Sequence, residues 1–158
     1  LELAINECRV ENGEAPLSYK KGPIAFISAY MAYTSRGEPI DVKIPDDPRA
    51  VAAYEAGKEF YYSKRGQLNF SCADCHVTNA GMQVRADKLS AALGHPSHFP
   101  VYRSKWGDMG TLHRRFDGCN KQVRAVPLPA QGEDYRNLEY FMTYMSNGLE
   151  FNGPGARK

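Results

Sequence analysis

The chain has 158 residues, of which 42% are hydrophobic and 24% charged, and a formal net charge of +2. These values are ordinary for a globular protein with one domain, or one small domain and part of another. The weak positive charge lacks the strongly basic footprint of nucleic-acid-binding proteins, so no nucleic-acid partner is expected. The longest apolar stretch, residues 24–33, is about half as long as a membrane-spanning helix, so no membrane span is expected.

The sequence begins at Leu1 rather than at a methionine, and no basic-then-apolar signal peptide opens it. We therefore expect the chain to be processed, trimmed or incomplete at its start. Further along, residues 36–47 are rich in Gly, Pro and Asp, which is typical of a boundary between two structural units.

A helix is predicted directly after this boundary, over residues 49–65. Asp47 and Pro48 are typical of an N-cap and a first helical position, and Gly66 is a typical stop. Small and aromatic side chains recur on one side of the segment, at Ala53, Gly57, Phe60 and Tyr61. This side is expected to pack against the core.

Residues 72–76 read Cys-Ala-Asp-Cys-His, the attachment pattern of a c-type haem. On a short helix, positions three and four apart share a face, so the thiols of Cys72 and Cys75 can reach one porphyrin while His76 faces its iron. A thioredoxin-like redox pair would lie within a βαβ pattern, and a zinc site would need a second pair of ligands. Neither pattern is visible. We therefore predict haem c, with His76 as the proximal iron ligand, and a periplasmic location, because this attachment occurs outside the bacterial cytoplasm.

A second amphipathic helix is predicted over about residues 134–147, with Gly148 as its stop. Its apolar positions are Leu138, Phe141, Met142 and Met145. A helix before the haem motif and a helix at the end are the plan of a small cytochrome c. The expected fold class is therefore mainly α, with a complete cytochrome c-like haem module at residues 47–158.

An internal repeat explains the residues before this module. A shift of 111 residues aligns residues 1–40 with 112–151 without a gap, and Cys8 falls on Cys119. Eight of the forty aligned positions are identical, against roughly two or three expected from average composition. Residues 1–46 are therefore predicted to be the C-terminal half of a first cytochrome c-like module, whose front half is not in this chain. Such a half is expected to pack on the second module or on a partner.

The iron ligand opposite His76 decides the function of such a module. Methionine is common in electron carriers, and the available methionines are Met82, Met109, Met142 and Met145. The histidine alternatives are His95, His98 and His113. Cys119 is a further candidate because it is not one of the two cysteines that attach the haem. It is otherwise a buried structural thiol or half of a disulfide with Cys8.

The surroundings of Cys119 are basic. Residues 101–125 hold six basic side chains against Asp108 and Asp117, at Arg103, Lys105, Arg114, Arg115, Lys121 and Arg124. Arg115 precedes Cys119 by four residues, which is one turn if a helix runs from Gly110 to Gly118. A guanidinium there favours the thiolate and can hold a small oxyanion, whereas most of the other cations are expected to pair with haem propionates or to face solvent. The equivalent position in the first copy is Ala4, so only the second copy places an arginine beside its cysteine.

The sequence around these residues resembles SoxA, the haem-bearing catalytic subunit of the SoxAX cytochrome complex. The resemblance rests on residues 94–96, 99–100, 102–103, 106, 112, 114–115 and 119, and on residues 5–6, 8–9, 67–69 and 127. It therefore covers nearly the whole chain, and its motifs are more specific than the haem attachment pattern alone.

This resemblance implies a periplasmic L-cysteine S-thiosulfotransferase of bacterial sulfur oxidation. Such an enzyme couples thiosulfate oxidatively to a cysteine of the SoxYZ carrier protein, and two electrons leave through haem to the small partner cytochrome SoxX. By position, His76 matches the proximal ligand, and Cys119 matches the distal ligand and catalytic sulfur, which is often a persulfide. Arg115 matches the essential catalytic arginine. Arg85 is a weaker candidate for binding substrate.

The chain departs from the family in one respect, because many members carry an earlier haem motif, and others replace that haem with a disulfide. No earlier motif is present here. Cys8 is therefore a ligand to a second haem in a segment outside this chain, half of a disulfide, or a free thiol. The alternative function is a non-catalytic mono-haem electron carrier with ligation by His76 and Met109 or Met142, and a third is a haem-stabilised scaffold that docks a catalytic partner.

Overall fold

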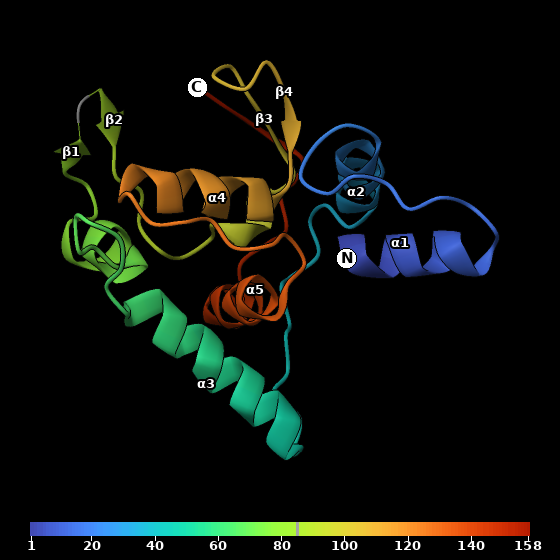
Figure 1. The fold of residues 1–158 in the computed structure, drawn as a ribbon, viewed down its shortest axis with the longest axis horizontal. Helices are drawn as coiled ribbons and strands as arrows, with labels where there is room; N and C mark the ends of the chain where they lie inside the picture. Colours follow the sequence, from blue (N-terminus) through green and yellow to red (C-terminus); the bar gives the residue numbers. More distant parts are fainter. Residues whose placement is uncertain (85) are drawn as a thin grey trace.

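The computed structural model describes residues 1–84 and 86–158, and it is mainly α-helical, as predicted (Figure 1). The α-helices of this part of the chain are α1 (Glu2–Glu11), α2 (Pro23–Thr34), α3 (Pro48–Tyr62), α4 (Leu112–Gln122) and α5 (Glu133–Met145). Two shorter helical turns are a π-helix, η1 (Asp74–Thr78), and a 3₁₀-helix, η2 (Pro96–His98).

The strands are short and make two small sheets. One is an antiparallel pair of β1 (Gln83–Val84) and β2 (Asp87–Lys88). The other has the order β4-β3-β5, formed by β3 (Val101–Arg103), β4 (Asp108–Gly110) and β5 (Gly155–Arg157). In it, β3 is antiparallel to β4 and parallel to β5, so the end of the chain is held beside the segment that leads into α4.

The start of α3 agrees with the prediction, but its end does not. The Asp47 carboxylate accepts a hydrogen bond from the Arg49 backbone N–H at 2.8 Å, and Pro48 is the first helical residue. The helix ends at Tyr62, earlier than expected, because the chain turns away at Ser63 and makes an isolated β-bridge between Arg65 and Phe70. The predicted helix over residues 134–147 is α5, which begins and ends one to two residues earlier.

The hydrophobic core lies where α3 crosses α5. Gly57 permits a close approach, because a Cβ there would collide with the backbone carbonyl of Asn137. The rings of Tyr61 and Phe141 pack with their centroids 5.4 Å apart. The buried apolar cluster comprises Tyr61, Ala73, Ala92, Leu112, Phe116, Tyr135, Leu138, Phe141 and Met142. The haem motif is anchored to this core, because Cys72 packs against it.

The helices of the first segment match those of the predicted repeat. A shift of 111 residues carries α1 onto residues 113–122 and α2 onto residues 134–145, within one residue of the bounds of α4 and α5. Figure 1 shows α1 and α2, in blue, on one side of the molecule, with α3 and α5 on the other. The division into units 1–46 and 47–158 stays a prediction, supported by these bounds.

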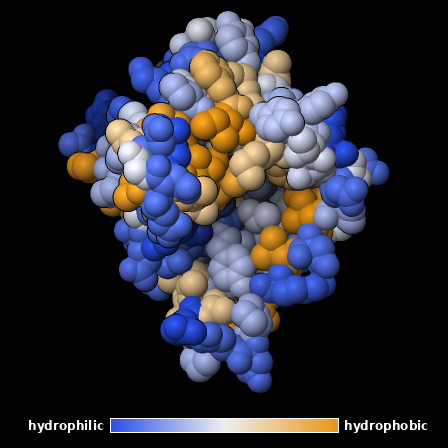
Figure 2. Space-filling model, turned by 90° about the vertical axis from the view of Figure 1, so that its right-hand side faces the viewer, coloured by the Kyte–Doolittle hydropathy of each residue, from blue (hydrophilic) through white to orange (hydrophobic). Residues whose placement is uncertain are grey.

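Hydrophobic side chains gather on the outer face at the level of α2 (Figure 2). The side chains of Phe26, Tyr30 and Tyr33 are 53%, 71% and 64% exposed. No helix in the described part of the chain combines the length and the apolar character needed to cross a membrane.

Candidate functional site

The haem motif forms a tight helical turn that is capped by its own neighbours. The Asp74 carboxylate accepts hydrogen bonds from the backbone N–H and the hydroxyl of Ser71, at 2.8 and 2.9 Å. These bonds hold the pKa of Asp74 below its usual range. The thiols of Cys72 and Cys75 are unpaired and partly exposed. The turn therefore presents both thiols, as attachment of a porphyrin requires.

His76 is oriented for binding a metal. Its Nδ1 lies 2.8 Å from the backbone carbonyl oxygen of Ser90, which can only accept, so Nδ1 carries the proton and Nε2 keeps a free lone pair. Burial lowers the pKa of His76, the bond to Ser90 opposes this effect, and the charge of Arg115 adds to it. The side chain is therefore held in its neutral, ligating form.

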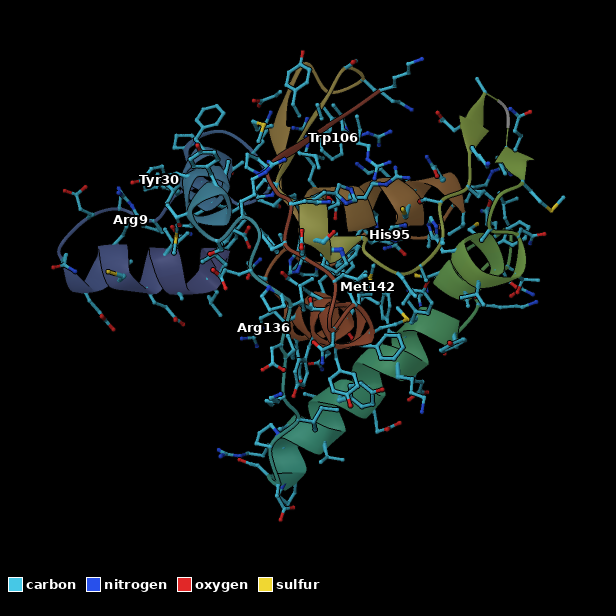
Figure 3. All side chains as sticks on the ribbon, turned by 180° about the vertical axis from the view of Figure 1, so that it is seen from behind. Arg9, Tyr30, His95, Trp106, Arg136 and Met142 are labelled. Carbon is cyan, nitrogen blue, oxygen red and sulfur yellow. The ribbon has the colours of Figure 1, made fainter. Side chains whose placement is uncertain are left out.

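His95 packs against the ring of His76, so it does not lie opposite His76 across an iron. The two imidazole rings meet edge to face, with centroids 4.4 Å apart, which leaves no room for an iron between them. The Nε2 of His95 lies 2.8 Å from the Ser90 hydroxyl oxygen. Burial first, and then the charges of His76, His98 and Arg115, lower the pKa of His95 to about 3. Figure 3 shows His95 next to α4.

His113 is buried in the core, where Nδ1 is hydrogen-bonded and Nε2 lies close to a carboxylate. The side chain is 1% exposed, its Nδ1 accepts a hydrogen bond from the Gln131 backbone N–H at 3.0 Å, and its Nε2 lies 2.8 Å from Glu139 Oε2. Among the methionines, Met142 is 4% exposed and belongs to the core cluster on α5 (Figure 3), whereas Met82 is 59% exposed. Met109 lies in β4, paired with Tyr102.

Cys119 lies on α4, close to the haem motif. Burial raises the pKa of the Cys72 thiol to about 11, an effect that Arg65 opposes and Cys119 reinforces. Burial and then Cys119 also raise the pKa of Cys75. These effects require the sulfur of Cys119 to lie near both thiols. Figure 1 agrees, because the C-terminal half of α4 reaches toward the green turn of residues 74–78.

Arg115 lies one turn before Cys119 on the same continuous helix, as the spacing predicts. Its charge contributes to the lowered pKa of both His76 and His95, so its guanidinium faces the same site. Within residues 1–84 and 86–158 the guanidinium makes no salt bridge, and no side-chain hydrogen bond joins it to another residue. An arginine without a carboxylate partner, beside a thiol, is suited to binding a small anion.

Two other arginines of the basic segment bracket Trp106. The guanidinium carbon of Arg114 lies 4.4 Å from the ring centroid, and that of Arg103 lies 5.2 Å from it. Arg114 also donates to the Met109 carbonyl at 3.0 Å, which makes it a structural residue. Burial and the nearby Arg115 lower the pKa of Arg103, so this side chain borders the site.

Ser90 and Tyr61 also belong to the site, and neither was predicted from the sequence. Ser90 holds His76 through a backbone carbonyl, which any residue type supplies, so no sequence signal marks it. The hydroxyl of the fully buried Tyr61 has no hydrogen-bond partner among the described residues. Burial raises the pKa of this group, and Cys72, Cys75 and Cys119 add to the effect.

Two further residues predicted from the sequence are Arg85 and Cys8. Arg85, the substrate-binding candidate, lies outside the described residues. Cys8 and Cys119 are both free thiols, so they do not form the disulfide considered from the sequence. Cys8 is exposed on α1, where the Asn12 side chain approaches its sulfur at 3.7 Å.

The residues of the site fit a covalently attached haem. Two thiols face it, a neutral imidazole offers Nε2, and the unpartnered Tyr61 hydroxyl borders it. A zinc site fits less well, because the described residues hold no group of three or more His, Cys, Asp or Glu side chains arranged for a metal ion.

Comparison with known proteins shows what the chain is similar to. No protein-family model matches it. It is 65% identical, over its whole length, to the L-cysteine S-thiosulfotransferase subunit SoxA of Allochromatium vinosum, and covers 57% of that protein. It is 60% identical to the SoxA subunit of Chlorobaculum thiosulfatiphilum, again over its whole length, and covers 55% of it. The chain therefore spans little more than half the length of these curated relatives.

A solved structure is similar over nearly the whole chain. The crystal structure of SoxXA from P. pantotrophus superposes with a TM-score of 0.90 at 35% sequence identity, over 99% of this chain and 58% of that one. This likeness confirms the predicted mainly α, cytochrome c-like fold class.

Proposed function

Because this chain belongs to the SoxA family of L-cysteine S-thiosulfotransferase subunits, we propose that it holds the haem site where thiosulfate is coupled to a cysteine of the SoxYZ carrier. The observation that carries the proposal is the position of Cys119. Its sulfur lies near Cys72 and Cys75, one helical turn after an arginine without a carboxylate partner among the described residues.

The chain's own residues hold the haem in this proposal. Cys72 and Cys75 would bind it covalently, and Nε2 of His76 and the sulfur of Cys119 would hold its iron. The carbonyl of Ser90 keeps the His76 ring in the required tautomer. When bound, the haem supplies an acceptor for the electrons that the coupling releases.

The reaction joins two sulfur atoms and releases two electrons. The carrier's cysteine thiol loses its proton to solvent, and its sulfur forms a bond with the outer sulfur of thiosulfate. The product is a cysteine S-thiosulfonate, and two electrons pass on to a SoxX-type partner cytochrome. In this net reaction Cys119, as a thiolate or a persulfide, is the reactive sulfur: it first bonds to the outer sulfur of thiosulfate as the two electrons leave. The carrier's thiolate then attacks that outer sulfur and displaces Cys119, which returns to its starting state.

Arg115 binds and orients the thiosulfate anion beside Cys119. A guanidinium offers two parallel N–H donors, which match two oxygens of a sulfonate group. The partly buried setting strengthens this interaction, because water screens it less.

The proposed partner cytochrome and the proposed cellular location of this chain also rest on its similarity to the SoxA family. The solved relative is a SoxXA complex, which supports a SoxX-type partner for this chain. Covalent haem attachment takes place outside the bacterial cytoplasm, so the proposed location is the periplasm.

The first segment is proposed to belong to an earlier cytochrome c-like module. Under the 111-residue shift, Tyr30 and Tyr33 of α2 are equivalent to Phe141 and Tyr144 of α5. Phe141 and Tyr144 pack on Tyr54 of α3, with ring centroids 5.5 and 5.1 Å away, whereas Tyr30 and Tyr33 are exposed. The exposed face of α2 therefore matches a surface that packs on a helix in the second copy.

The proposal is tested with the full-length haem protein in complex with its partner cytochrome. Cys119→Ser is expected to abolish thiosulfate-dependent loading of SoxYZ while haem stays attached, whereas Cys8→Ser leaves the haem at Cys72 and Cys75 spectroscopically unchanged. Mass spectrometry of the peptide that contains Cys119 distinguishes a thiol from a persulfide. A near-red methionine-to-iron charge-transfer band in the oxidised protein and full activity of Cys119→Ser would instead establish the electron-carrier function.

A further inference from the structure

The two copies of the repeat contact each other reciprocally. Lys20 and Gln131 are equivalent positions in the loops α1–α2 and α4–α5, and both have positive φ values, 84° and 60°. The Lys20 carbonyl accepts from the Thr111 N–H at 3.0 Å, and its ammonium pairs with Asp117 of α4 at 2.5 Å. The Gln131 amide donates to Glu2 of α1 at 3.0 Å. Each loop therefore reaches the first helix of the other copy, as in an isologous interface.

A buried polar network lies at this interface. Glu2 and His113 are equivalent positions, as are Ser28 and Glu139. In the first copy the Ser28 hydroxyl donates to Glu2 Oε1 at 3.2 Å, and in the second copy His113 Nε2 lies 2.8 Å from Glu139 Oε2. The two copies therefore contribute one equivalent pair each to this network.

Gln131 joins the two pairs. Its side-chain Nε2 donates to Glu2 Oε2 at 3.0 Å, and its backbone N–H donates to His113 Nδ1 at 3.0 Å. Glu2, Gln131 and His113 are 7%, 8% and 1% exposed. A buried carboxylate or imidazole that loses its partner is costly, because no water replaces the lost hydrogen bond. The network therefore ties α1 and α4 together strongly.

Two faces of the helix α4 have different neighbours. Asp117 pairs with Lys20 of the first copy, and His113 is joined to Glu2 of the first copy through Gln131. Arg115 and Cys119 instead face the haem motif. Because a helix of this length moves as a rigid rod, the contacts on the first face fix where the second face lies. Arg115 is two residues from both His113 and Asp117, so it is the part of the site most directly fixed in this way.

We propose that Glu2, Gln131 and His113 are positioning residues that hold α4 against the first copy and thereby place Arg115 and Cys119 at the haem. The expected change in KM for thiosulfate rests on the proposed function, whereas the expected change in amide exchange of α4 does not. The first copy then supports α4, independently of any cofactor that the first copy carries.

The test uses the full-length haem protein with its partner cytochrome and compares three variants of α1. Glu2→Leu removes both acceptor oxygens of the network. Glu2→Gln keeps the shape, accepts from Gln131 and donates to Ser28. Glu7→Leu is the matched control, because Glu7 is exposed on the same helix. The measurements are amide hydrogen exchange across residues 112–122, the kinetics with thiosulfate, and the absorption spectrum of the haem.

Glu2→Leu is expected to speed exchange in α4 about tenfold and to raise KM for thiosulfate about tenfold, with a smaller change in kcat. Glu2→Gln restores both values to within about twofold of the wild type, and Glu7→Leu changes neither. Unchanged exchange in Glu2→Leu overturns the proposal. Faster exchange with unchanged KM and an unchanged haem spectrum also overturns it, because the contact is then merely structural.

A double-mutant cycle tests whether the residues act through one contact. Glu2→Leu combined with Gln131→Met is expected to speed α4 exchange no more than the stronger single variant. Additive effects would contradict the shared contact. If the wild-type protein does not turn over thiosulfate, the proposed function fails, and exchange in α4 with the haem spectrum still decides the positioning role.

Discussion

Arg115 and Cys119 lie four residues apart on one continuous helix, and the guanidinium of Arg115 makes no salt bridge within the described residues. Burial lowers the pKa of His76 and of His95, and the charge of Arg115 adds to both effects, so Arg115 lies at the haem motif. The two residues thus pair a sulfur with a free cation at the same site.

Arg115→Ala is expected to lower kcat/KM for thiosulfate about 100-fold, because the developing charge loses its donor. The haem content, measured by the absorbance of the alkaline pyridine haemochrome, is expected to stay unchanged. Lys121→Ala is the control, since Lys121 is exposed on the same helix. A parallel loss of haem and of turnover would show that Arg115 has a structural role.

Two fully buried tyrosines form a natural matched pair. The Tyr135 hydroxyl accepts hydrogen bonds from the Asn120 side chain at 2.8 Å and from the Leu128 N–H at 3.1 Å, whereas the Tyr61 hydroxyl has no partner among the described residues. Tyr135→Phe is expected to lower the free energy of unfolding by about 1–3 kcal/mol, because both donors lose their acceptor. Tyr61→Phe is expected not to lower it in the apoprotein, because no hydrogen bond is lost and a buried unpaired hydroxyl is removed.

Urea denaturation of the haem-free chain measures both variants. If Tyr61→Phe alters the haem spectrum of the loaded protein, its hydroxyl contacts the haem. Equal destabilisation of the two apoproteins would contradict the difference in their surroundings.

Gly57 is expected to resist substitution even by alanine. Alanine favours a helix by about 1 kcal/mol over glycine, but its Cβ would collide with the Asn137 carbonyl of α5. Gly57→Ala is therefore expected to destabilise the fold by about 3 kcal/mol or more, since backbone atoms must move. The neighbouring exposed Ala56→Gly measures propensity alone and should cost about 1 kcal/mol. Thermal unfolding followed by circular dichroism checks both, and a stabilised Gly57→Ala protein would rule out the close crossing.

His95 is expected to make stability depend on pH. Its pKa is about 3 in the folded chain, mainly because of burial, against about 6.5 when unfolded. Below pH 6.5 the unfolded chain binds a proton that the folded chain does not, so the contribution of His95 is complete above pH 6.5 and is lost as the pH falls toward 3. Between pH 7 and pH 5 this loss amounts to at most about 2 kcal/mol.

The comparison is the free energy of unfolding of the wild type and of His95→Gln, measured with urea at pH 7 and pH 5. The variant is expected to lose less stability on acidification, because glutamine does not titrate. Equal losses in the two proteins would mean that His95 is protonated in the folded state.

Much of the framework could be predicted from local patterns. Asp47 and Pro48 start α3 as their residue types predict. The 111-residue repeat agrees with the structure, because α1 and α2 shifted by 111 residues match the bounds of α4 and α5 to within one residue. The spacing of Arg115 and Cys119 placed them one turn apart, which holds on the observed helix. These predictions succeed because capping, helical periodicity and repetition depend on residues close in sequence or on direct copies of them.

The contacts that hold the site came from the tertiary structure alone. Ser90 orients His76 through a backbone carbonyl, and Gln131 joins Glu2 to His113 across 129 and 18 residues of chain. The sequence by itself supplied the haem attachment motif and the spacing of Arg115 and Cys119, on which the proposed haem-binding and reactive residues rest. Only the tertiary structure decided which histidine is free to bind a metal and which contacts hold α4. Both depend on which buried hydrogen-bond donors and acceptors meet, and segments far apart in the sequence supply these groups.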